Sequence, residues 1–160
     1  MFVWRLTRRT HADDPLSGEG ARRYGGRWNH IGVPIVYASE SLSLAVLEYL
    51  VNLPLSDLPA DLVSIQIEIP GTLPRTEISI DDLPDNWRTF PATDELKEIG
   101  TDWAQQAKTA ILVLPSVVIP NERNFLLNPS HALARKFVVI SIQSFTLDDR
   151  LQGGPRAARR

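Results

Sequence analysis

The chain has 160 residues, carries 17 Lys and Arg against 19 Asp and Glu for a formal net charge of −2, and contains no cysteine. This length is typical of one domain, and the lack of cysteine excludes disulfides, thiolate catalysis and metal sites built on thiolates. No apolar run approaches the roughly 18–20 residues of a membrane span, and the chain opens without a signal-peptide pattern, so we expect a cytoplasmic protein.

The charges are segregated along the chain. Residues 1–32 carry six arginines against three acids, whereas residues 57–102 carry eleven acids against three bases. Overall there are 14 Arg and only 3 Lys. Arginine is favoured where phosphate or carboxylate is bound through two parallel hydrogen bonds, so the bias favours a local anion site over a broad nucleic-acid surface. Solvated or ion-paired surface arginines are the alternative.

The first 38 residues predict two strands separated by an irregular loop. Residues 2–6 alternate apolar and less apolar side chains, and residues 34–38 form an apolar run typical of a buried strand. Residues 12–32 hold five of the nine glycines. Because glycine permits sharp turns and a close approach of the backbone to a ligand, we expect this segment to be an irregular loop.

A helix and a third strand follow. Ser39 or Ser41 can cap a helix that runs to about Asn52 and is stopped by Pro54. From Leu62 onward, apolar and polar residues alternate with a period of two, which predicts a strand with one face in water. Residues 70–92 are rich in proline and acids and indicate a connection.

The remaining sequence predicts short helices and the closing strands of the sheet. Thr93 and Thr101 are candidate caps for two helical pieces separated at Gly100. Residues 110–114 and 117–119 are apolar strands interrupted by Pro115 and Ser116. Asn128-Pro129 predicts a short helix through Arg135, residues 137–142 predict the last strand, and the tail from Arg150 is expected to be frayed or disordered.

Glu48 is an isolated carboxylate in an apolar helix. It lies in the run Leu42-Ser43-Leu44-Ala45-Val46-Leu47-Glu48-Tyr49-Leu50-Val51, where apolar residues occur on all sides at helical spacing, so we expect the helix to be packed on both sides. An unpaired carboxylate there costs several kcal/mol, so Glu48 is expected to face a cleft or a cation. A structural ion pair with Arg27 or Arg5 is the alternative.

Three further residues are candidates for ligand contact. Arg27 follows two glycines, and a guanidinium on such a loop can bind a pyrophosphate; a simple turn with a surface arginine is the alternative. Tyr37, on a predicted buried strand, is either core or a flat surface on which a base or nicotinamide stacks. Ser116, at the break between two apolar segments, is either a turn residue or a ligand contact. The histidines lack the spacing of a metal pair, so we expect no metal.

These residues occur in an order that resembles the RES domain, named for an Arg, a Glu and a Ser. The resemblance covers residues 2 to 145 and rests on Gly18-Glu19-Gly20-Ala21, Gly25-Gly26-Arg27-Trp28-Asn29, Val36-Tyr37-Ala38-Ser39, Ala45 with Glu48, Pro115-Ser116, and Asn124-x-Leu126-Leu127-Asn128-Pro129-x-His131. It implies an α+β single domain with a central mixed or antiparallel sheet of the ADP-ribosyltransferase type and a few short helices. We place this domain at residues 1–147, followed by a flexible basic tail over 148–160.

The resemblance also implies the activity and the roles of the residues. Members of the family are toxins of bacterial toxin–antitoxin pairs that consume NAD or transfer its ADP-ribose. It implies Glu48 and Arg27 as catalytic residues, and Arg27, Tyr37, Ser116 and Asn124 as NAD-binding residues. The implied partner is an Xre-like helix-turn-helix antitoxin, with a homodimer within the complex left open and no direct contact with nucleic acid or membrane.

Cleavage of the nicotinamide–ribose bond fits these side chains, because a carboxylate can stabilise the oxocarbenium character that develops when neutral nicotinamide leaves. The acceptor of ADP-ribose is left open among water, phosphate and a protein side chain. Two other classes remain as alternatives: a non-catalytic module that binds a nucleotide or protein through the arginine-rich loop, and an RNA-cleaving toxin. The scarcity of lysine and the absence of a histidine pair weigh against RNA cleavage.

Overall fold

The computed structural model describes residues 1–54, 57–148 and 150–151. In chain order its elements are β1 (Phe2–Arg8), η1 (Arg9–His11), α1 (Glu19–Tyr24), β2 (Val36–Ser39), α2 (Leu42–Leu50), β3 (Leu62–Glu68), β4 (Thr76–Glu77), η3 (Ile80–Asp82), α3 (Asp94–Gln106), β5 (Ile111–Pro115), β6 (Arg123–Leu127), η4 (Ala132–Lys136) and β7 (Val138–Ser144). The η elements are short 3-10 helices. The predicted tail falls mostly on residues 149 and 152–160, which lie outside the described residues.

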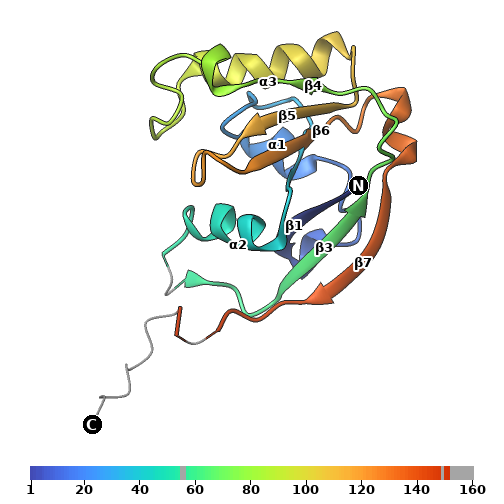
Figure 1. Ribbon diagram of the computed structural model, residues 1–160. Coiled ribbons are helices and arrows are strands. Elements are labelled where there is room, and N and C mark those ends of the chain that lie inside the picture. Colours follow the sequence, from blue (N-terminus) through green and yellow to red (C-terminus); the bar gives the residue numbers. More distant parts are fainter. Residues whose placement is uncertain (55–56, 149, 152–160) are drawn as a thin grey trace.

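Within the described residues, the strands form one sheet in the order β4-β5-β6-β2-β1-β3-β7. β4 and β5 are parallel, and the other neighbouring pairs are antiparallel. The expected α+β domain with a mixed central sheet and a few helices is confirmed. Figure 1 shows β4, β5, β6 and α3 at one end of the molecule, β1, β3 and β7 at the other, and α2 beside β1.

The sheet is weakest where β1 meets β2. These strands share the single pair Trp4–Ser39, whereas β1 pairs with β3 along its whole length. We call this junction the β1–β2 seam. Because the ladder there is one pair long, few backbone hydrogen bonds join the two halves of the sheet.

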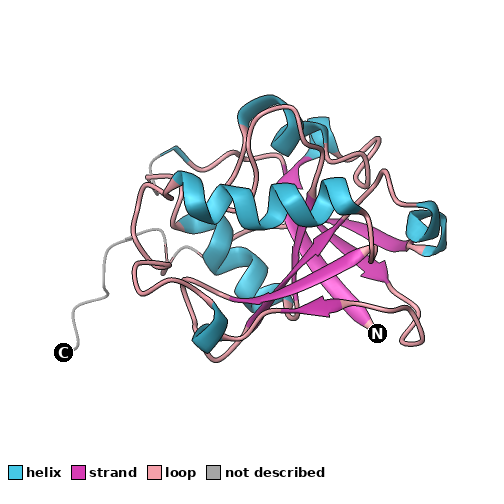
Figure 2. Ribbon diagram, turned by 90° about the horizontal axis from the view of Figure 1, so that it is seen from above, coloured by secondary structure: helices cyan, strands magenta, loops and turns pink. Residues whose placement is uncertain are grey.

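Two apolar clusters pack on opposite faces of β2, β5 and β6. Phe125 pairs with Ala38 and Val113, and all three belong to the first cluster. The next residue, Leu126, belongs to the second cluster, and successive side chains of a strand point to opposite faces. The second cluster also contains Leu96 and Trp103 of α3. Seen from above, α3 lies across the strands that it covers (Figure 2).

Local signals predicted α2 well. Ser41 is the N-cap, and its hydroxyl accepts a hydrogen bond from Leu44 N at 3.1 Å. The expectation of packing on both sides is wrong, because only Leu44 and Ala45 are fully buried, while Leu47 and Val51 are exposed. The helix therefore covers the sheet with one face and leaves an apolar face outward.

The glycine-rich segment and α3 differ from the prediction. Residues 19–24 form α1, with Gly18 at φ 68° as its N-cap, so the segment is not wholly irregular. α3 is continuous through Gly100 instead of being broken there. A Cβ at Gly100 would lie 2.1 Å from the carbonyl oxygen of Trp28. Gly100 is therefore where the helix contacts the Trp28 backbone, and it does not end the helix.

Two strands and one short helix also differ from the prediction. Residues 117–119 are not a strand; the chain turns there and returns as β6. β3 has the predicted alternation, but its polar face is only partly in water, because Ser64 is 6% exposed whereas Gln66 is half-buried and Glu68 exposed. The short helix after Asn128-Pro129 is the 3-10 helix η4, capped by His131.

Candidate active site

A cleft of about 1450 Å³ opens at the β1–β2 seam. Its walls come from β1, β2, α2, the segment that contains α1, and the connection before α3. Among its lining residues are Trp4 and Ser39, which form the single pair of the seam, and the predicted site residues Arg27, Tyr37, Glu48 and Asn124.

Glu48 is half-buried on α2 and lines this cleft. It lies four residues after the buried Leu44 and three after the buried Ala45, so helical spacing places it on the face that packs toward the sheet. Its Oε1 accepts two hydrogen bonds, from Ser116 Oγ at 2.7 Å and from Asn124 Nδ2. No hydrogen bond from the described residues reaches Oε2. The carboxylate is thus fixed through one oxygen, and the other is available.

Ser116 can only donate to Glu48. Its Oγ already accepts hydrogen bonds from Val118 N at 3.1 Å and Ile119 N at 2.9 Å. A hydroxyl has one proton and two acceptor sites, so its proton is left for the carboxylate. Ser116 is completely buried and lies behind Glu48, outside the lining of the cleft.

Asn124 is the second residue of β6 and pairs with Ser39 of β2. Its Oδ1 accepts a hydrogen bond from Ser39 Oγ at 2.8 Å, while its Nδ2 donates to Glu48. The amide therefore links the seam strand β2 to the carboxylate on α2.

A structural ion pair is not the reason for the position of Glu48. Among the described residues, no Lys, Arg or His nitrogen lies within 4.0 Å of its carboxylate, so the alternative pairing with Arg27 or Arg5 is not formed. Its direct partners are a neutral hydroxyl and a neutral amide, so the negative charge is not cancelled by a bonded cation.

Arg27 lines the same cleft and is near enough to Glu48 to interact with it electrostatically. Its Nη1 donates to the carbonyl oxygens of Trp87 at 3.1 Å and Thr89 at 3.0 Å. Burial lowers the pKa of the Arg27 guanidinium, and the charges of Glu48 and Tyr37 act in the opposite direction. A guanidinium has five N–H donors, so Nε and Nη2 of Arg27 remain available for an anion.

Tyr37 lines the cleft, and its hydroxyl is already occupied. The hydroxyl donates to Asn29 Oδ1 at 2.7 Å and accepts from Trp28 N at 3.1 Å. Burial raises the pKa of the Tyr37 hydroxyl, partly offset by the Trp28 hydrogen bond and the charge of Arg27. Gly26 allows this contact, because a Cβ there would lie 2.6 Å from the Tyr37 oxygen.

Sequence reasoning missed two polar residues of this site. Asn29 is completely buried, and its Nδ2 contacts the carbonyl oxygens of Ala21, His30 and Val33 while its Oδ1 accepts from Tyr37. Ser39 is 3% exposed and bonds to Asn124. Each lies two residues after a predicted site residue, Asn29 after Arg27 and Ser39 after Tyr37, and a polar residue so close to a site residue is the signal that could have found them.

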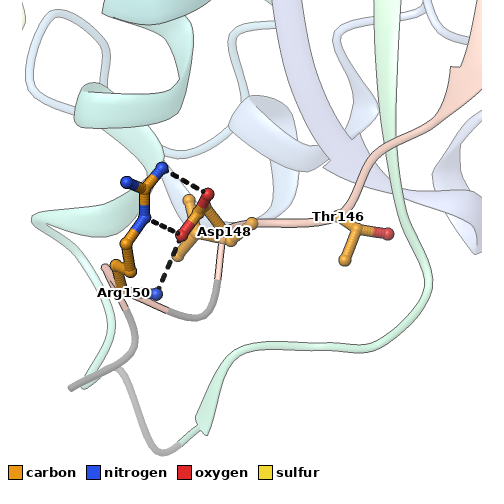
Figure 3. Close-up of a pocket in the computed structure, with 4 residues that line it drawn as sticks. Thr146, Asp148 and Arg150 are labelled. Atoms are coloured by element: carbon orange, nitrogen blue, oxygen red, sulfur yellow. Dashed lines mark hydrogen bonds and ion pairs between the residues drawn. The ribbon is translucent and has the colours of Figure 1, made fainter. Parts of the chain in front are cut away.

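A second, open hollow lies beside the C-terminal segment, and it is separate from this site. It is lined by Thr146, Leu147, Asp148 and Arg150. Figure 3 shows Arg150 folded back on Asp148, whose carboxylate accepts two bonds of 2.9 Å from the guanidinium. These hydrogen bonds hold the pKa of Asp148 below its ordinary value. The charges of this hollow are paired with each other.

Membrane-spanning helices and metal clusters are both absent from the described residues. In the part of the chain that the structure describes, no helix is long and apolar enough to cross a membrane. No group of three or more His, Asp or Glu side chains in the described ranges could hold a metal ion.

The fold and the site define a mixed-sheet α+β domain whose seam holds an arginine, a tyrosine ring and a carboxylate around one cleft. The model of the RES domain family matches residues 2–148. The chain belongs to this family.

Curated relatives cover nearly the whole chain. The chain is 40% identical over 152 residues to the "Prs ADP-ribosylating toxin" of Sphingobium sp. (strain YBL2), covering 92% of this chain and 94% of that protein. It is 38% identical to the "Toxin Res" of Photorhabdus laumondii and 37% identical to that of Yersinia enterocolitica, with 94% and 95% of this chain covered, and 97% and 100% of the relatives.

A solved structure has the same fold. A chain in the crystal structure of the M. tuberculosis MbcT–MbcA toxin–antitoxin complex superposes with a TM-score of 0.74 at 17% identity, covering 95% of this chain and 86% of that chain. At this identity the likeness concerns the fold alone.

Proposed function

We propose that this protein is the toxin of a bacterial type II toxin–antitoxin pair and that it cleaves NAD at the nicotinamide–ribose bond in the cleft at the β1–β2 seam. The observation that carries the proposal is the Glu48 carboxylate, which lines the cleft, is fixed through Oε1 and has Oε2 available. The names of the relatives, which include an ADP-ribosylating toxin, support the substrate and the toxin role.

Glu48 is the catalytic residue in this proposal. Departure of neutral nicotinamide from NAD leaves positive charge on the ribose, as in glycoside cleavage, and needs no general acid. Oε2 of Glu48 stabilises this charge or accepts a hydrogen bond from a ribose hydroxyl. A preorganised electrostatic contact of this kind is typically worth about 10² to 10³ in rate.

Arg27 and Tyr37 bind two different parts of NAD in this proposal, the diphosphate and the nicotinamide. Nε and Nη2 of Arg27 bind the diphosphate, since charge-assisted bonds from a guanidinium suit phosphate oxygens. The Tyr37 ring supports the nicotinamide, because Tyr37 lines the cleft and its hydroxyl is used by Asn29 and Trp28.

Ser116 and Asn124 serve this site through Glu48. Ser116 is completely buried, so its contribution to NAD binding is to hold the carboxylate. Asn124 lines the cleft as well, so it both holds Glu48 and offers its amide to the ligand.

The acceptor of ADP-ribose defines the finer activity. Water gives a glycohydrolase, phosphate a phosphorylase, and a protein side chain an ADP-ribosyltransferase. The name of the Sphingobium relative favours transfer to a protein. The domain is proposed to span residues 1–147, with a basic tail after it. It is proposed to act in the cytoplasm and to need no metal. Its proposed inhibitor is an Xre-like antitoxin.

The direct test is to incubate purified protein with NAD and measure free nicotinamide, with Glu48→Gln as the inactive variant. Gln keeps the volume and the hydrogen-bonding capacity but lacks the charge, so release is expected to fall at least 10²-fold. Glu40→Gln is the matched control, because Glu40 is a half-buried carboxylate paired with Arg123 at 3.0 Å. No nicotinamide release by folded wild-type protein would contradict the proposal and favour a binding module, and RNA cleavage by the same preparation would favour an RNA-cleaving toxin.

A further inference from the structure

Ser39 is a buried polar residue to which the reaction described above assigns no role. It ends β2, is 3% exposed, and pairs with Trp4 at the β1–β2 seam. Its hydroxyl donates to Asn124 Oδ1 at 2.8 Å. Asn124 in turn donates from Nδ2 to Glu48 Oε1, so a continuous hydrogen-bonded path runs from Ser39 to the carboxylate.

The direction of each bond along this path is determined by chemistry. A carboxylate only accepts, so Asn124 must turn its NH₂ group toward Glu48. Its carbonyl oxygen then points the opposite way, where it can accept a hydrogen bond from a donor. Ser39 Oγ is the side-chain donor at that position.

We propose that Ser39 is a positioning residue for catalysis, which fixes the Asn124 amide and thereby sets the orientation of the Glu48 carboxylate. This inference rests on the proposed cleavage of NAD. Without the Ser39 hydroxyl, the Asn124 carbonyl loses its partner, and the amide can rotate away from Glu48. Ser116 still holds Oε1, so the carboxylate remains in the cleft but is held by one donor in place of two.

The expected result is a loss mainly of kcat. Ser39→Ala should lower kcat for nicotinamide release about three- to tenfold, the range for one hydrogen bond. KM for NAD should rise by a smaller factor, because Arg27 and Tyr37 are untouched and only the Asn124 amide, which also lines the cleft, is displaced. Ser39→Thr keeps the hydroxyl and should restore most of kcat. Ser64→Ala is the control, since Ser64 is a buried serine on β3, 6% exposed, that does not line the cleft.

A double-mutant cycle distinguishes positioning from a general structural effect. If Ser39 acts through Asn124, then Ser39→Ala should have no further effect on kcat in an Asn124→Ala background. Full additivity of the two losses, or wild-type kcat in folded Ser39→Ala, would overturn the inference.

A readout that does not need turnover separates this inference from the proposed function. The NMR signals of the Asn124 side-chain NH₂ group should shift and broaden in Ser39→Ala and not in Ser64→Ala. Absence of nicotinamide release by the wild-type protein would refute the proposed function, whereas an unchanged Asn124 signal in Ser39→Ala would refute the role of Ser39.

Discussion

Arg27 and Arg8 allow a cleft arginine to be compared with a surface arginine. Arg8 is paired with Asp61 at 3.1 Å and its side chain is 51% exposed, whereas Arg27 lines the cleft. Arg27→Ala should raise the Kd for NAD roughly 10- to 100-fold, the value of charge-assisted hydrogen bonds, while Arg8→Ala should change it less than twofold. Isothermal titration of the two variants measures the difference, and equal curves would make Arg27 a turn residue.

Two variants of Tyr37 distinguish the role of its hydroxyl from the role of its ring. Tyr37→Phe leaves Asn29 Oδ1 without its donor, so the free energy of unfolding should fall by about 1–3 kcal/mol while the Kd for NAD stays close to that of the wild type. Tyr37→Ala should weaken NAD binding as well. Urea unfolding and NAD titration of both variants provide the measurement. A large loss of NAD affinity in Tyr37→Phe would show that the hydroxyl contacts the ligand directly.

Glu48 shows what sequence can and cannot predict about a residue. A lone carboxylate in an apolar helix is visible in the sequence, and so is the cap at Ser41. Its partners are not visible, because Ser116 and Asn124 lie 68 and 76 residues further along the chain. Their contact with Glu48 depends on the pairing of β6 with β2. The start of β6 is hard to recognise in the sequence, because its first two residues, Arg123 and Asn124, are polar.

At the scale of elements, two helical glycines should respond in opposite ways to alanine. Gly100→Ala places a Cβ 2.1 Å from the Trp28 carbonyl oxygen, so it should destabilise the protein by more than the about 1 kcal/mol that alanine gains in a helix. Gly20→Ala in α1 meets nothing within 4 Å and should stabilise it by roughly 0.5–1 kcal/mol. Thermal unfolding of both variants tests this, and a stabilised Gly100→Ala would show that α3 can move away from Trp28.

The short helix α1 should depend on pH through Glu19. Hydrogen bonds from Arg22 and Arg23 lower the pKa of this exposed carboxyl to about 2. A lowered pKa means that its contribution is present above the ordinary value of about 4.5 and is lost as the pH falls toward about 2. The difference in Tm between wild type and Glu19→Gln should therefore shrink from pH 6 to pH 2. A difference that stays constant would contradict this.

The sequence predicts elements whose ends are marked by nearby residues. It does not predict features that depend on contacts with residues far away in the chain. The cap of α2 and the stop after it are local, so its position was correct. The continuity of α3 through Gly100 depends on Trp28, which lies far away in sequence, and no local pattern reports that contact. The same holds for the burial of Ser64 on β3, which no local pattern reports.

For the whole molecule, the proposed function predicts a cellular phenotype. Expression of this chain alone should arrest bacterial growth and lower cellular NAD, and co-expression of an antitoxin encoded beside it should relieve both effects. Glu48→Gln, expressed to the same soluble level, should leave growth and NAD unchanged. Measuring NAD in cell extracts tests the prediction, and normal growth with unchanged NAD at high expression of folded wild-type protein would favour a binding module.

The distance in sequence between Glu48 and its two hydrogen-bond donors also determines when the site is completed during synthesis. A nascent chain of 115 residues already contains Arg27, Tyr37 and Glu48, but it lacks Ser116, Asn124 and the strand β6 that supports β2. A ribosome that stalls or terminates before that point releases a fragment that keeps the partners of Arg27 at Trp87 and Thr89 but has neither donor for the Glu48 carboxylate. The carboxylate is oriented only after residue 124 has been made.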